Sequence, residues 1–111
     1  MAPALQLGEF EQVVLLAILR LKDEAYGASI RAEISRCTER EPTAGALYTT
    51  LDRLEEKSLV ESRFGDPTPE RGGRPKRFFT VTKAGLEAVT RAQRSYQRLL
   101  EGVTLPRRAH A

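Results

Sequence analysis

The sequence predicts a mainly α-helical α+β protein, a winged helix-turn-helix followed by a C-terminal helix. Apolar residues recur every three or four positions in four separate segments, as on the buried face of an α-helix. Between the third and fourth segments, two short β-branched or aromatic runs flank a polar loop, which is the pattern of a β-hairpin. The 111 residues suffice for one hydrophobic core without disulfides or metals.

The first predicted helix covers residues 9–21, where Phe10, Val14 and Ile18 repeat at helical spacing. It contains the longest apolar run, VVLLAIL, which is far shorter than the roughly 20 residues needed to span a membrane. The N-terminus lacks the basic start and apolar run of a signal peptide. We therefore expect a soluble, cytoplasmic protein with no membrane partner.

The second predicted helix presents one stripe of residues: Tyr26, Ile30, Ile34 and Cys37. It should end before Glu41-Pro42, because the residue before a proline disfavours helix. The lone Cys37 cannot form an internal disulfide, and neither a His nor a second Cys stands near it. We expect it to be a small buried residue of that stripe.

The third predicted helix begins after Thr43, a good N-cap, and runs to about Lys57. Leu47, Leu51 and Leu54 should face inward. The other side carries small and mostly hydroxylated residues instead of the Glu and Lys pairs usual on a solvated helix: Gly45, Ala46, Thr49, Thr50 and Arg53. This composition indicates that a partner approaches the helix closely.

The predicted hairpin has strands at residues 60–64 and 77–81, joined by a loop that contains the cationic stretch RGGRPKR. Positive charge is segregated toward this part of the chain. Residues 1–62 contain seven Lys or Arg and eleven Asp or Glu, whereas residues 63–111 contain eleven and four. A glycine-rich cationic loop is suited to a polyanion.

The last predicted helix is capped by Thr82 and extends to about Gly102. One face repeats at heptad spacing, which indicates a partner helix and hence a homodimer through Leu86, Val89, Gln93, Tyr96, Leu100 and Val103. We accordingly divide the chain into a winged-helix DNA-binding domain, 1–81, and a C-terminal dimerisation helix with its tail, 82–111.

Double-stranded DNA is the partner that the third helix and the loop would share. Small residues let a helix approach base edges in the major groove, while the loop cations neutralise flanking phosphates. In the recognition helix we expect DNA contacts from Thr43, Gly45, Ala46, Tyr48, Thr49, Thr50 and Arg53. In the wing we expect them from Arg71, Gly72, Gly73, Arg74, Lys76 and Arg77.

Two other function classes are weaker. The sequence offers no metal-ligand cluster, no nucleophile beside a base and no glycine-rich phosphate loop between a strand and a helix, so we predict no enzyme, catalytic residue, metal or cofactor. A winged-helix module that binds protein instead of DNA stays open as the alternative, because fold does not determine function. Retention on DNA that weakens with salt distinguishes the two.

Three segments resemble the PadR family of bacterial transcriptional regulators: Tyr26-Gly27, TAGALYTTLDRLEEKSLVES from Thr43, and GRPKRFFTVTKAGLEAV from Gly73. The most specific motifs are Gly45-x-Leu47-Tyr48-x-x-Leu51-x-x-Leu54-Glu55 and Thr82-x-x-Gly85. At Ser58 a glycine is more usual in the family, so we expect strain or a looser turn where the third helix ends.

The resemblance implies a repressor that dimerises through its C-terminal helix, packed against helix one of its partner, on a two-fold symmetric operator near promoters. It also implies a possible small hydrophobic effector. Family members often bind effectors at the dimer centre, where Trp residues stack planar drugs. This sequence has no Trp, so the effector is a point on which it departs from the family.

Overall fold

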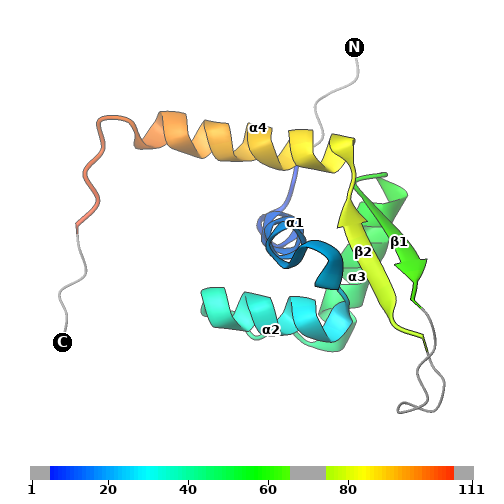
Figure 1. Cartoon of the computed structure of the whole chain (residues 1–111). Helices are drawn as coiled ribbons and strands as arrows, with labels where there is room; N and C mark the ends of the chain where they lie inside the picture. The colour runs from blue at the N-terminus through cyan, green and yellow to red at the C-terminus, as the bar shows by residue number, and fades with distance from the viewer. Residues whose placement is uncertain (1–5, 66–74, 107–111) are drawn as a thin grey trace.

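The computed structural model describes residues 6–65 and 75–106, and it is a winged helix with a two-stranded sheet. Figure 1 shows the elements in chain order: α1 (Glu9–Leu21), the 3₁₀ turn η1 (Lys22–Glu24), α2 (Gly27–Cys37), α3 (Ala44–Glu56), β1 (Val60–Phe64), β2 (Arg77–Val81) and α4 (Lys83–Leu100). The four helices and the hairpin predicted from the sequence are confirmed. Within the described ranges, no helix is long and apolar enough to cross a membrane.

The two strands are antiparallel and run in register from Val60 opposite Val81 to Phe64 opposite Arg77. A short stretch before α2 extends this sheet. The Phe79 amide donates a hydrogen bond to the Ala25 carbonyl at 2.8 Å, and Tyr26 forms a bridge with Phe78. The hairpin is thereby attached to the start of α2 by backbone hydrogen bonding.

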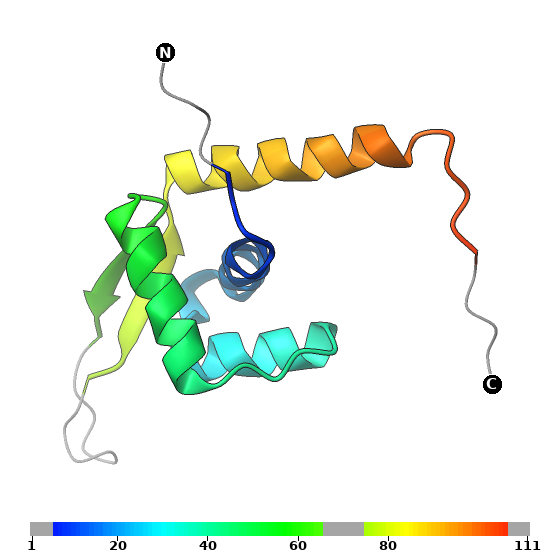
Figure 2. The same ribbon diagram turned by 180° about the vertical axis from the view of Figure 1, so that it is seen from behind.

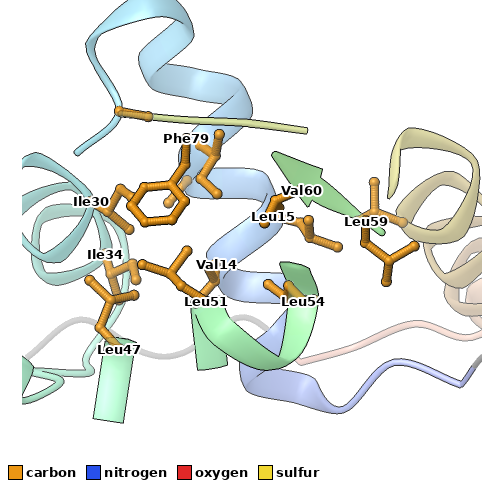
Figure 3. Packing of buried hydrophobic residues seen from close by; sticks show 14 of the residues in the cluster. Val14, Leu15, Ile30, Ile34, Leu47, Leu51, Leu54, Leu59, Val60 and Phe79 are labelled. Carbon is orange, nitrogen blue, oxygen red and sulfur yellow. The ribbon is translucent and has the colours of Figure 1, made fainter. Parts of the chain in front are cut away.

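The hydrophobic core lies around α1, which Figures 1 and 2 show end-on between α2 and α4. In Figure 3, buried side chains from α1, α2, α3 and both strands converge, with Phe79 of β2 close to Ile30 of α2. Val14, Leu15 and Leu47 are fully buried. Each helix therefore has one face fixed by the core, which decides which of its residues remain exposed.

Threonine caps begin α3 and α4, as the sequence predicted. The Thr43 hydroxyl accepts a hydrogen bond from the Ala46 amide at 3.0 Å. The Thr82 hydroxyl accepts one from the Gly85 amide at 3.0 Å and donates one to the Ser58 carbonyl at 2.7 Å. The cap of α4 thus also links that helix to the turn between α3 and β1.

The strain expected where α3 ends is confirmed at Ser58, whose φ of 62° is in the left-handed region. The Leu59 amide bonds to the Leu54 carbonyl, and the Ser58 amide bonds to the Glu55 carbonyl, each at 2.9 Å. This is the Schellman pattern, which usually has glycine at the left-handed position. Leu54 and Leu59, the hydrophobic pair of the motif, are both buried.

Two expectations about the helices were wrong. Cys37 is exposed, because the buried row of α2 ends at Ile34 and the last turn lies beyond the core; its sulfur lies 3.5 Å from the Glu33 carboxylate. Helix α4 ends at Leu100, not at about Gly102, which instead has a φ of 77°. In α2 the apolar pattern continued beyond the core although the helix continued with it, whereas in α4 it continued beyond the helix itself.

Candidate nucleic-acid interface

The first two turns of α3 expose small uncharged residues. Thr43, Gly45, Ala46 and Thr49 are all exposed, and residues 44–51 contain no charged side chain. A Cβ atom placed on Gly45 would meet no atom of the described residues within 4 Å, apart from its chain neighbours and the backbone of its own helix. Figure 2 shows the start of α3 on the same side of the molecule as the ends of β1 and β2 that lead into the wing. A large partner could therefore contact the start of α3 and the base of the wing from the same side.

Thr50 does not belong to this surface, which corrects the sequence analysis. It is only 6% exposed and lies in the buried row of Leu47, Leu51 and Leu54. Threonine carries a methyl group beside its hydroxyl, so its chemistry suits either side of a helix. Helical spacing was the signal that could have decided between Thr49 and Thr50, because Thr50 is three residues after Leu47 and four before Leu54.

Tyr48, on α3, packs its side chain against the start of α2. It is 37% exposed, and its ring centroid is 6.5 Å from that of Phe79. A Cβ atom on Gly27 would be only 2.2 Å from the Tyr48 hydroxyl oxygen, so glycine is required for this approach. The Tyr-Gly pair before α2 thus has a packing role, while a phosphate contact by Tyr48 stays a prediction.

The second half of α3 is acidic at its surface. Arg53 is exposed as predicted, but Asp52 and Glu56 are exposed beside it and Glu55 is half-buried. A polyanion could approach the uncharged first half of α3, but it would be repelled at the second half unless cations lay close by. The neighbouring strand β2 supplies one of them.

Arg77 is bound to α3, which does not fit its expected role as a free wing cation. One of its nitrogens lies 2.6 Å from Glu55 Oε1, and another lies 3.8 Å from Asp52 Oδ1. Its guanidinium also stacks 4.9 Å from the centre of the Phe79 ring. The sequence missed this ion pair because its partners are 22 residues apart.

The remaining wing residues divide into two groups. Arg71, Gly72, Gly73 and Arg74 lie outside the described residues. Lys76, which is described, places its ammonium 4.2 Å from the centre of the Tyr26 ring.

Arg63 on β1 is a cation that the sequence analysis missed. It lies opposite Phe78 and stacks 4.9 Å from the centre of that ring. The Phe78 and Tyr26 rings form an edge-to-face pair, with centroids 5.6 Å apart. Cations therefore flank an aromatic pair at the base of the wing. The cross-strand register with an aromatic residue was the signal that could have identified Arg63.

The predicted dimer face of α4 is divided by the structure. Leu86, Tyr96, Leu100 and Val103 are 41–53% exposed. Val89, in contrast, is 2% exposed and belongs to the core of its own chain, and Gln93 lies beside Gln12 of α1, with 3.4 Å between their side-chain amides. The exposed residues continue into a groove between α1 and α4 lined by Leu16 and Leu19.

Ion pairs hold the helices that carry this surface. Lys57, at the end of α3, lies 2.9 Å from the buried Glu11 carboxylate of α1. Burial disfavours the charged form of Glu11, but hydrogen bonds from Lys57 and the Gly8 amide outweigh this effect and lower its pKa. Among the described residues, no group of three or more His, Cys, Asp or Glu could hold a metal ion.

Comparison with known proteins identifies transcriptional regulators. The model of the transcriptional regulator PadR-like family matches residues 15–91. The transcriptional regulator Rv3488 of Mycobacterium tuberculosis is 36% identical over 83 residues, which cover 73% of this chain and 71% of the relative.

Solved structures agree on the fold. A PadR family regulator from Clostridium difficile superposes with a TM-score of 0.68 at 24% identity, covering 84% of this chain and 93% of the other. A PadR-like regulator from Bacillus cereus gives 0.69 at 19% identity, covering 85% and 86%. At these identities the structural likeness supports the winged-helix fold alone.

Proposed function

Because this chain belongs to the transcriptional regulator PadR-like family, we propose that it is a sequence-specific DNA-binding repressor. It acts as a homodimer on a two-fold symmetric operator. The family consists of regulators and not of enzymes. Helix α3 enters the major groove, and the wing contacts the flanking backbone.

The observation that carries this proposal is the open space around Gly45. Glycine inside a helix destabilises it by roughly 0.5–1 kcal/mol relative to alanine. Apart from the backbone of α3 itself and the two chain neighbours, no atom of the described residues lies within 4 Å of the position that a Cβ would take there, so their packing does not require glycine. A partner that must approach the helix backbone does require it. Base edges at the floor of the major groove are such a partner.

The proposed DNA-contacting set follows the exposure of each side chain. Thr43, Gly45, Ala46 and Thr49 face the groove, with Tyr48 and Arg53 directed to the backbone. Arg71, Gly72, Gly73 and Arg74 contribute from the wing on the sequence argument alone, and Lys76 contributes at its base. Thr50 is left out because it is buried, and Arg77 because it is paired with Glu55.

Homodimerisation is proposed through α4. Tyr96 and Leu100 remain about half exposed on a helix that extends past the core, and Leu16 and Leu19 continue the apolar surface onto α1. Two copies that cover these faces would remove the apolar area from water. Two recognition helices would then read two half-sites.

The test begins with selection of bound duplexes from a random pool by the wild-type chain. We expect an enriched two-fold symmetric sequence. Ala46→Glu then places a carboxylate on exposed α3, so binding should fall to non-specific strength while the melting temperature stays near wild type. The matched control is Ala84→Glu, at an exposed alanine in the first turn of α4, which should bind normally. Normal binding by Ala46→Glu contradicts the placement of α3 in the groove.

Salt dependence separates DNA binding from the alternative, a winged-helix module that binds protein. The logarithm of the affinity should fall linearly with the logarithm of salt concentration. Arg74→Ala should flatten that slope by about one unit and weaken all duplexes equally if it contacts phosphate. A protein that shows no salt-dependent retention on DNA would favour the alternative.

A small hydrophobic effector completes the proposal. The apolar groove between α1 and α4 is part of the proposed dimer face, so a molecule bound there would alter the spacing of two recognition helices. The chain has no Trp to stack a planar ligand, so aliphatic contacts would hold it. A broad panel of small apolar molecules is tested for release of the selected duplex from the protein. If none of them releases the duplex, the effector is dropped from the proposal.

A further inference from the structure

We infer that Arg77 is a positioning residue: its ion pair with Glu55 fixes the wing hairpin against α3, and it does not itself contact DNA phosphate. The inference rests on the proposed function, since the angle that it fixes matters only if α3 and the wing bind the same DNA. It also reverses the role that the sequence predicted for this residue.

Glu55 connects both strands of the hairpin to α3. Its Oε1 atom accepts a hydrogen bond from Arg77 Nη2 at the start of β2, at 2.6 Å. Its Oε2 atom accepts one from Ser62 Oγ on β1, at 2.8 Å. One carboxylate therefore bonds to both strands near the point where the hairpin leads into the wing. A rotation of the hairpin relative to α3 would break both bonds.

Arg77 is held on its other side by Phe79, over whose ring its guanidinium lies at 4.9 Å. Phe79 is 1% exposed and also faces the Tyr48 ring of α3. If Arg77 turned outward to a phosphate, it would leave this ring. It would also leave Glu55 and Asp52 without their cation near the DNA backbone, where two carboxylates repel phosphate.

The two roles of Arg77 predict opposite effects for Glu55→Gln. If Arg77 contacts phosphate, the substitution frees it from a competing carboxylate and removes a negative charge near DNA, so affinity rises. If Arg77 positions the hairpin, the neutral amide holds it less strongly. Specific affinity then falls even though the chain has become more positive.

The experiment compares wild type, Glu55→Gln, Arg77→Gln and the double variant on two duplexes. One duplex is selected by the wild-type chain from a random pool, and the other has the same composition in scrambled order. Each single variant should bind the selected duplex about three- to thirtyfold more weakly, which lies within the range for coupling between contacting residues. The affinity of the double variant for the selected duplex should be no lower than that of the weaker-binding single variant. On the scrambled duplex, Glu55→Gln should bind as well as wild type or better.

Arg63→Gln is the matched control, because it removes the same charge from the same hairpin. Arg63 stacks on Phe78, its register partner in β2. Phe78 precedes Phe79 in the strand and therefore lies on the opposite face of the sheet. Its loss should weaken both duplexes by the same factor. A specific effect confined to the Arg77–Glu55 pair then separates positioning from general electrostatics.

Three results would overturn the inference. The first is tighter binding of the selected duplex by Glu55→Gln. The second is a double variant whose loss of binding free energy equals the sum of the losses in the two single variants. If Arg77→Gln melts below the assay temperature, the charge-reversed double variant Glu55→Arg with Arg77→Glu is used in its place. The third overturning result is that this double variant binds the selected duplex no more tightly than either single reversal. If the wild type selects no duplex at all, the proposed function fails first and the inference fails with it.

Discussion

Ser58 has a backbone conformation that favours glycine over serine. Its φ of 62° closes the Schellman turn after α3, and an L-residue in this region is destabilised by roughly 1–2 kcal/mol. The motif is complete in its hydrogen bonds and in its Leu54–Leu59 contact, so the conformation is imposed by the packing on both sides.

Ser58→Gly should therefore stabilise the chain by about 1 kcal/mol, because glycine adopts this conformation without the Cβ penalty. Ser58→Ala is the control, and it should stay within about 0.5 kcal/mol of wild type because the penalty persists. Urea unfolding at one fixed protein concentration measures both. Equal stability of the three proteins would show that the turn is not strained.

Glu33 gives the molecule a predictable acid response. Hydrogen bonds from Arg36 and then Arg20 lower the pKa of Glu33 from 4.5 to about 2. Because the unfolded chain binds this proton more tightly, the carboxylate stabilises the fold above pH 4.5, and that contribution is lost as the pH falls toward 2. The bond to Arg20 joins α2 to α1, whereas Arg36 lies on α2 itself, three residues after Glu33.

Glu33→Gln should consequently be less stable than wild type near neutral pH, and the difference should shrink between pH 4.5 and 2. Thermal melts across this range measure the difference. A gap that stays constant with pH would mean that Glu33 titrates normally in the folded chain.

At the scale of elements, α4 approaches the turn before β1 so closely that only glycine fits between them. A Cβ atom on Gly85 would lie 2.1 Å from the Leu59 carbonyl oxygen and 2.8 Å from a Val81 methyl carbon. The Thr82-x-x-Gly85 motif thus combines a helix cap with a contact that a side chain would block.

Gly85→Ala should destabilise the chain by about 1–3 kcal/mol, the usual effect of overpacking, because backbone must move to admit the methyl group. Gly45→Ala makes the same chemical change near the start of α3, where a Cβ would meet no other element of the described structure within 4 Å. It should be neutral or stabilise by up to about 1 kcal/mol while weakening DNA binding. Urea unfolding measures the stability of both variants against wild type. Equal stabilities of Gly85→Ala and Gly45→Ala would contradict the prediction that only Gly85 is required by packing.

At the scale of the whole molecule, the exposed half of α4 predicts that the chain is not monomeric. Sedimentation at micromolar concentration should give twice the 12.4 kDa chain mass. Tyr96→Glu and Leu100→Glu should dissociate the dimer, because an unpaired carboxylate in an apolar interface is strongly unfavourable. Both residues are 41–50% exposed in the single chain, so the monomer should remain folded.

Phe64→Glu is the control for that experiment. Phe64 is 69% exposed and lies on the hairpin, away from α4, so its substitution should leave the dimer intact. A wild-type monomer, or a dimer that survives both α4 substitutions, would place the interface elsewhere or remove it.

The sequence by itself determined the elements and their order. Apolar spacing located four helices, threonines marked the starts of α3 and α4, and the β-branched runs located the hairpin to the residue. These features are local, since each depends on neighbours within about one turn of helix or along one strand. The same local motifs carried the family resemblance that the comparisons confirmed.

Only the tertiary structure decided which side each ambiguous residue faces and with what it pairs. Val89 belongs to the core while Leu86 does not, and Arg77 binds Glu55. Residues of intermediate character fit either environment, so their side depends on where elements distant in sequence press against the helix. An ion pair between β2 and α3 is likewise absent from local patterns, because the fold alone brings its partners together.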